Sequence, residues 1–102
     1  MSVSELFKET RLPVLAAPLF IISYPELVIA QCKSGVIGSF PALNARPAEE
    51  LEKWIIKIST ELEQYKKDNP NEIVSPFAVN QICHSSNDRL EHDVDVCVKH
   101  KV

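Results

Sequence analysis

The chain has 102 residues, of which 45% are hydrophobic and 25% are charged, and its formal net charge at pH 7 is −3. This balance is typical of a folded domain and excludes intrinsic disorder, and the lack of a basic cluster gives no reason to expect nucleic acid as a partner. The sequence contains neither an apolar run long enough to cross a membrane nor the basic and apolar regions of a secretory signal, so we expect no membrane partner.

A short helix and a strand are predicted in the first 20 residues. Ser2 and Glu5 have the spacing of a capping box, which favours a helix over about Val3–Thr10. The following small apolar run, Val14–Ala17, is typical of a strand that is buried on both faces. The chain therefore begins with a helix that leads into a core strand.

A second S-x-x-E pattern then predicts a helix and a turn. Ser23 and Glu26 have capping-box spacing, and the helix is expected to continue to Ser34. Gly35 suits the left-handed position that ends many helices. The apolar run Val36–Phe40 predicts a second buried strand.

A long amphipathic helix is predicted after Pro47. Acidic residues lie near its start, and Lys66 and Lys67 lie near its end, as the helix dipole favours. Apolar residues recur at spacings of three and four, which indicates one buried face. The residues of this face are Leu51, Trp54, Ile55, Ile58, Leu62 and Tyr65.

The last third of the sequence predicts one more strand and one more helix. Phe77–Gln81 is expected to form a third short strand, and Asn87 with Asp88 is expected to open a third long helix. The expected apolar face of that helix consists of Leu90, Val94, Cys97 and Val98.

Strands and helices thus alternate along the chain, which predicts an α/β fold with a parallel sheet. A doubly wound sheet and a TIM (β/α)8 barrel both fit this order. With only two glycines, the sequence has neither a dinucleotide-binding nor a P-loop motif, which argues against the nucleotide-binding versions of the doubly wound sheet. A complete barrel needs ~250 residues. Residues 1–102 would therefore form its first three βα units, truncated, with an unpaired strand edge that calls for a further part of the protein or a second copy.

In both architectures, ligands bind at the carboxyl ends of the strands. The first such end is Ala17-Pro18-Leu19, where Pro18 makes a rigid turn that suits a flat ligand or merely ends the strand. Asn80 ends the third strand, and its carboxamide offers a donor and an acceptor to a heteroaromatic ring or a phosphate, or else to a neighbouring loop. Gly38 permits the backbone to approach a ligand closely, but a β-bulge or a tight contact between helix and sheet explains this glycine equally well.

Other reactive side chains give weaker signals. His84 lies in the loop after the third strand and is either a proton donor or a loop residue. Cys97 and His100 have a spacing found in zinc sites, but no second close pair accompanies them, so we predict no metal site. The three cysteines form no C-x-x-C pair, and we expect free thiols in a cytoplasmic protein.

Several short motifs together resemble the N-terminal portion of the nitronate monooxygenases, formerly called 2-nitropropane dioxygenases. The resemblance covers nearly the whole chain and departs from the family at Leu19, where a methionine is usual. It rests on the segments Leu12–Leu19, Ser23–Leu27, Val36–Phe40 and Pro76–Gln81, followed by His84, Asn87, Asp88, Arg89 and Leu90.

This resemblance implies an FMN-dependent TIM barrel that oxidises alkyl nitronates with molecular oxygen. By motif position, Ala17, Pro18 and Leu19 would border the flavin, and Asn80 would contact it. The family's catalytic histidine and glycine-rich phosphate loops would lie beyond Val102, so no catalytic residue is expected here and the chain alone would be inactive. Two alternatives remain open: a fragment of a flavin-dependent enoyl-acyl-carrier-protein reductase, and a non-enzymatic truncated remnant.

Overall fold

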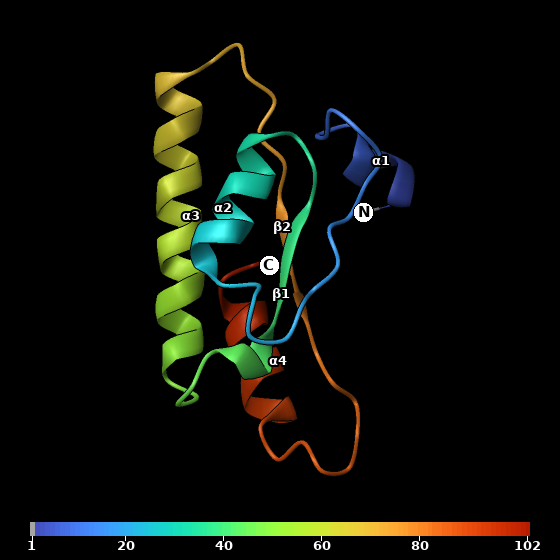
Figure 1. Ribbon diagram of the computed structural model, residues 1–102, viewed down its shortest axis with the longest axis vertical. Coiled ribbons are helices and arrows are strands. Elements are labelled where there is room, and N and C mark those ends of the chain that lie inside the picture. The colour runs from blue at the N-terminus through green and yellow to red at the C-terminus, as the bar shows by residue number, and fades with distance from the viewer. Residues whose placement is uncertain (1) are drawn as a thin grey trace.

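The computed structural model describes residues 2–102, which form four α-helices and a short parallel sheet. Figure 1 shows α2 and α3 on one side of the strands, with α1 and the segment after it on the other side. In chain order the elements are α1 (Val3–Phe7), α2 (Pro25–Lys33), β1 (Gly38–Pro41), the 3-10 helix η1 (Ala42–Asn44), α3 (Glu50–Asp68), β2 (Phe77–Asn80) and α4 (Leu90–Lys99). The predicted α/β class is confirmed.

The sheet is parallel, as predicted. β1 pairs with β2 in a register that sets Gly38 opposite Phe77 and Pro41 opposite Asn80. On the other side of β1, Leu15 forms a parallel bridge with Ile37. Three extended segments therefore lie side by side in chain order and run in one direction.

The prediction that Val14–Ala17 is a strand buried on both faces is wrong. Only Leu15 forms a bridge, and the side chains of Val14 and Leu15 are 44% and 48% exposed. Two backbone hydrogen bonds hold the segment against Ile37, the residue directly before β1: Ile37 N donates to Val14 O at 3.0 Å, and Ala16 N donates to Ile37 O at 2.8 Å. Within residues 2–102, no strand pairs with its outer edge, so the ladder does not extend.

Gly38 marks the point where β1 lies closest to α2. A Cβ atom at Gly38 would lie 2.6 Å from the backbone oxygen of Val28 and 3.1 Å from Cys32 Sγ. The glycine therefore serves a tight contact between helix and sheet, one of the three roles left open by the sequence. The core on this side of the sheet is built around Val28, Ile29, Cys32, Phe40, Leu51, Ile55, Ile58 and Leu62.

The helix termini were predicted with mixed success. The Ser2–Glu5 capping box is confirmed, although α1 ends at Phe7 and not at Thr10. The second capping box is wrong, because Tyr24 is the N-cap of α2 and the Ser23 hydroxyl accepts a hydrogen bond from Leu19 N at 2.8 Å. Gly35 has a φ of +94°, which confirms the left-handed turn after α2.

The two C-terminal helices differ in how well their buried faces were predicted. Leu51, Ile55, Ile58 and Leu62 of α3 are buried, as expected. In α4, however, Val94 is 39% exposed and Val98 is 71% exposed, whereas Asp93 is fully buried. The expected apolar face of α4 is therefore confirmed only in part. Leu90 and Cys97 are half-buried, and Cys97 packs against the core. Asp93, three residues after Leu90 and four before Cys97, is buried on the same side of the helix. None of the helices in residues 2–102 is long and apolar enough to cross a membrane.

Candidate functional site

The carboxyl ends of the three extended segments meet at one edge of the sheet, which lies at the bottom of Figure 1. Since Leu15 pairs with Ile37, Ala17 is level with Ser39, which pairs with Ala78. The Ser39 hydroxyl donates a hydrogen bond to Ala16 O and so fastens the first segment to β1 near this edge. The segment Ala17-Pro18-Leu19 and the end of β2 are thus brought to the same edge.

Ala17 and Asn80 share the face of the sheet that α2 and α3 leave uncovered. Phe40 and Val79, which are paired across the strands, pack against the core on the helix side. Successive side chains of a strand point to opposite faces, so Asn80, which follows Val79, points away from these helices. Ala17 is level with Ser39, which precedes Phe40, and is therefore on the same face as Asn80. Both residues are exposed.

Asn80 and Leu19 present free surface at this edge. The Asn80 side chain forms no hydrogen bond with any residue from 2 to 102, so its carboxamide is available to a ligand. Leu19 is 46% exposed. Pro18 is half-buried and has no N–H to satisfy. The edge thus combines an apolar turn with one free amide.

The turn that follows Pro18 is held by Asn44, a residue that the sequence did not single out. The Asn44 amide nitrogen donates to Leu19 O and to Ser23 O, both at 3.1 Å, and its oxygen accepts from Ile21 N at 3.3 Å. Asn44 is only 6% exposed, so these bonds are shielded from water. Its position in the loop after the second strand was the only signal in the sequence.

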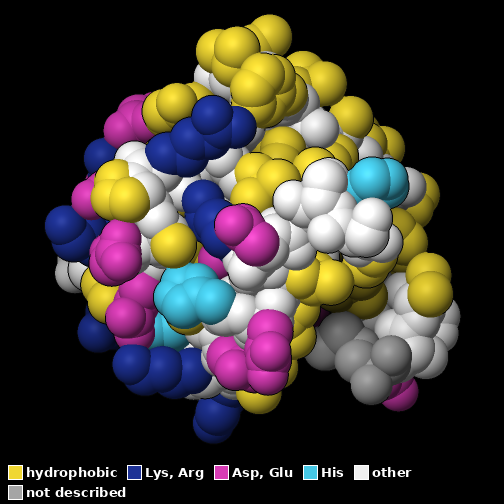
Figure 2. Space-filling model, turned by 90° about the horizontal axis from the view of Figure 1, so that it is seen from below, with side chains coloured by type: hydrophobic (Ala, Val, Ile, Leu, Met, Phe, Trp, Pro, Cys, Tyr) yellow, Lys and Arg dark blue, Asp and Glu magenta, His cyan; other side chains and the backbone are white. Residues whose placement is uncertain are grey.

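The same turn is strained and apolar. Ile21 has a φ of +69°, which is rare for a β-branched residue and costs roughly 1–2 kcal/mol. Phe20, Ile21 and Ile22 are 61%, 65% and 63% exposed. Figure 2 views the molecule from this edge, with charged side chains over the α3 side and hydrophobic side chains gathered on the right and at the top. Strain and exposed apolar area in one turn are typical of binding segments.

The hollows found within residues 2–102 have neither Ala17 nor Asn80 in their walls, although one of about 300 Å³ is lined by Val79 and Gln81, on either side of Asn80. One of about 440 Å³ lies at the opposite edge of the sheet, where Leu6, Leu62 and Phe77 contribute to its wall. Another, of about 290 Å³, lies at the carboxyl edge but outside the sheet, between the turn after Pro18 and the start of α3. The predicted flavin edge is therefore an open surface.

The predicted histidine and cysteine side chains are engaged in local contacts. His84 Nδ1 accepts from Ser86 N at 3.0 Å within an exposed turn, so the ring belongs to the loop structure. Cys97 Sγ lies 3.5 Å from Gln81 Nε2, whereas His100 Nε2 lies 2.8 Å from Glu52 Oε1. Across residues 2–102, no three potential metal ligands are gathered.

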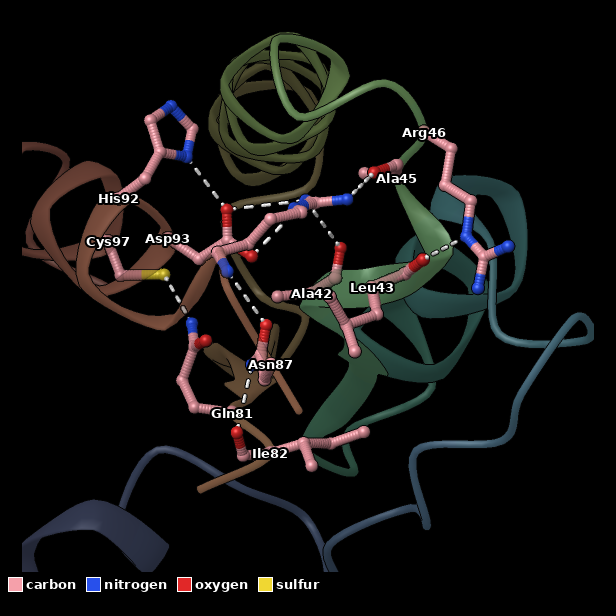
Figure 3. Close-up of polar contacts among 11 residues, drawn as sticks. Ala42, Leu43, Ala45, Arg46, Gln81, Ile82, Asn87, His92, Asp93 and Cys97 are labelled. Carbon is pink, nitrogen blue, oxygen red and sulfur yellow. Dashed lines mark hydrogen bonds and ion pairs between the residues drawn. The ribbon is translucent and has the colours of Figure 1, made fainter. Parts of the chain in front are cut away.

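A polar network around the buried Asp93 links α4 to the segment that follows β1, and Figure 3 shows its contacts. Arg89 donates to Ala45 O at 2.7 Å and to Ala42 O at 3.3 Å, and it lies 3.2 Å from the carboxylate of Asp93. His92 Nδ1 lies 2.8 Å from the same carboxylate. This network anchors α4 to η1, and hence to the loop that carries Asn44.

The fold and this edge define a class, a small α/β protein with a parallel sheet and an open carboxyl edge. A scan against protein-family models, a search of curated proteins and a search of solved structures each found no match.

Proposed function

We propose that this chain forms one wall of the flavin site of an FMN-dependent oxidoreductase of the nitronate monooxygenase type, built on the first three units of a TIM barrel. The observation that supports the proposal is the parallel, in-order arrangement of three extended segments with Ala17-Pro18-Leu19 and Asn80 at their common carboxyl edge. In such barrels this edge carries the active site. A cytoplasmic location is part of the same proposal.

The residues at this edge fit part of the cofactor. An exposed carboxamide without a partner in residues 2–102 can both donate to and accept from the polar rim of a flavin ring, and the apolar turn at Pro18 and Leu19 suits its flat face. The chain offers no glycine at this edge to hold the phosphate group of FMN, because Gly35 lies at the opposite edge of the sheet and Gly38 is covered by α2. The chain thus fits the ring and leaves the phosphate to other residues.

Each side chain would have a limited role in the reaction. When bound, FMN would supply the chemistry by which electrons pass from an alkyl nitronate to molecular oxygen. Ala17, Pro18 and Leu19 would orient the ring and exclude water from one side of it. Asn80 would hold the polar rim. No residue of this chain is assigned to proton transfer, so the chain alone is expected to have no turnover.

FMN titration of the purified chain tests the proposal. We expect saturable quenching of flavin fluorescence, and about fivefold weaker binding for Asn80→Ala, because one hydrogen bond contributes about 1 kcal/mol. Asn71→Ala, an exposed asparagine in the loop before β2, is the matched control and should bind as the wild type does. Equal affinity for the wild type and Asn80→Ala, or no quenching at any FMN concentration, would rule out the proposed wall.

The substrate is tested with this chain after it has been combined with the remaining barrel units of a nitronate monooxygenase. Oxygen consumption with an alkyl nitronate would support the proposed reaction. Reduction of an enoyl thioester at the expense of a nicotinamide cofactor, without nitronate oxidation, would favour the enoyl-acyl-carrier-protein reductase instead.

A further inference from the structure

The hollow of about 290 Å³ at the carboxyl edge has a chemical character that the flavin proposal does not use. It lies between the turn after Pro18, η1 and the first turns of α3. Three aromatic side chains and three polar ones contribute to its wall: Phe20, Tyr24, Trp54, Asn44, Arg46 and Glu50. A concave site with aromatic walls and a few polar groups is the usual form of a small-molecule site.

The aromatic part of the wall is pre-organised. The rings of Tyr24 and Trp54 lie 4.8 Å apart, centroid to centroid, and Trp54 packs edge-on against the buried Phe40 at 5.5 Å. Trp54 is therefore fixed by the core while part of its side chain stays accessible. A rigid aromatic wall favours a flat ligand, because little side-chain freedom is lost on binding.

The polar part of the wall includes a guanidinium that can receive an anion. Arg46 lies over the Phe20 ring at 5.7 Å, and its Nε donates to Leu43 O at 3.0 Å. Within residues 2–102, no carboxylate lies at ion-pair distance from Arg46, whereas Glu50 is paired with Lys53 at 3.1 Å. Figure 3 shows the Arg46 side chain on the far side of the Ala42–Ala45 segment from Asp93.

The strained turn lies beside this hollow. Ile21, with its φ of +69°, also contributes to the wall, and its N–H is held by Asn44, another wall residue. Backbone strain that is maintained by a buried side chain at the rim of a concave site is a recurrent feature of ligand-binding loops. The turn's geometry and the wall's chemistry are independent observations that point to the same place.

From these observations we propose that the hollow binds a small planar carboxylate, with the aromatic ring of the ligand against Trp54 and Tyr24 and its carboxylate on the guanidinium of Arg46. A guanidinium matches a carboxylate through paired N–H donors. The site is separate from the flavin edge at Ala17 and Asn80 and does not depend on the proposed flavin function.

Trp54 is the only tryptophan of the chain, so its fluorescence reports directly on this hollow. Titration with benzoate should change its emission saturably, with a Kd of roughly 1 mM, as expected for so small a ligand. Benzamide, which is planar but neutral, and acetate, which is anionic but not aromatic, should each bind at least about tenfold more weakly. Amide chemical shifts of Ile21, Tyr24 and Asn44 should move in the same titration.

Two charge variants test the assignment of Arg46. Arg46→Gln should weaken benzoate binding about tenfold, and Glu50→Gln should strengthen it two- to threefold, roughly, by removing a nearby negative charge. Lys67→Gln, at the far end of α3, changes the net charge as Arg46→Gln does and should leave the affinity unchanged. Arg46 and Lys67 are both exposed, so we expect both variants to fold, and circular dichroism verifies this.

The proposal would be overturned by the lack of a saturable response to benzoate, by equal affinity for benzoate and benzamide, or by equal benzoate affinity in the Arg46→Gln and wild-type chains. Tighter binding of choline than of benzoate would also overturn it, because an aromatic wall with Glu50 would then be serving as a cation site.

Discussion

The Arg89 guanidinium lies 3.2 Å from the carboxylate of Asp93, four residues later on α4, and this pair stands where the sequence predicted apolar contacts. Asp93 is fully buried and Arg89 is 18% exposed. The guanidinium also donates to the carbonyl groups of Ala45 and Ala42. One cation thus joins α4 to η1, and its charge is compensated by a carboxylate on its own helix.

Asp93→Ala should destabilise the chain by about 3–5 kcal/mol, because it leaves the Arg89 charge in the interior without a counter-ion. Urea unfolding followed by circular dichroism measures the change. Asp95→Ala, an exposed aspartate of the same helix, should change stability by less than about 0.5 kcal/mol. Equal effects of the two substitutions would show that the pair does not hold α4.

The arrangement of elements followed from the sequence, but the environment of α4 did not. Apolar periodicity identified the buried face of α3, because Leu51, Ile55, Ile58 and Leu62 recur at helical spacing and all four are buried. In α4, the same criterion selected Val94 and Val98, which are exposed. Periodicity treats every charge as a surface residue, whereas Asp93 is buried because Arg89 accompanies it. The i,i+4 spacing of opposite charges was the available signal.

The candidate site was predictable only as far as topology determines it. Parallel strands bring their carboxyl ends together, so the proximity of the Pro18 turn to the end of β2 follows from the order of elements. The role of Asn44 depends on contacts with Leu19 and Ser23, more than 20 positions earlier in the chain. No local pattern encodes such contacts. The pairing of Tyr24 with Trp54 was beyond prediction for the same reason.

Gly38→Ala should cost about 1–3 kcal/mol in stability, since the added Cβ would lie 2.6 Å from Val28 O. Thermal unfolding measures the loss. Adding Cys32→Ala removes the sulfur 3.1 Å away but leaves the backbone oxygen in place, so it should not restore the stability. Full recovery in the double variant would show that the contact with the helix backbone is not the cause.

The loss of folding stability at low pH should depend on Glu52. Hydrogen bonds from Lys99 at 2.6 Å and from His100 at 2.8 Å lower the pKa of Glu52 from its ordinary value of 4.5 to about 2. Ionisation therefore favours the folded chain. This contribution is complete above about pH 4.5 and is lost as the pH falls through about 2.

Glu52→Gln should make the folding stability less dependent on pH between about 4.5 and 2, as measured by urea unfolding at a series of pH values. Glu61→Gln is the matched control on α3, since Glu61 forms no ion pair within residues 2–102, and it should leave the slope close to that of the wild type. If folding stability depended on pH in both variants as it does in the wild type, the contact of Glu52 with the end of α4 would not contribute to stability.

Cys83 should react fastest with a thiol reagent. It is exposed, whereas burial raises the pKa of the Cys32 and Cys97 thiols and so lowers their thiolate content at neutral pH. A disulfide reagent that releases a coloured thiolate should show one fast equivalent in the folded chain and three after unfolding. Cys83→Ser should remove the fast phase, and persistence of that phase would place the reactive thiol elsewhere.

Replacing Ile21 with glycine should stabilise the chain. Glycine relieves a left-handed conformation that costs a branched residue roughly 1–2 kcal/mol, and the greater freedom of the unfolded chain offsets part of this gain, which leaves about 0.5–1 kcal/mol. Little packing is lost, because Ile21 is 65% exposed. Ile22→Gly is the matched control, since Ile22 is 63% exposed but has no positive φ, and it should destabilise the chain. Thermal unfolding of the two variants should therefore give shifts of opposite sign, and a decrease for Ile21→Gly would mean that the turn stores no strain.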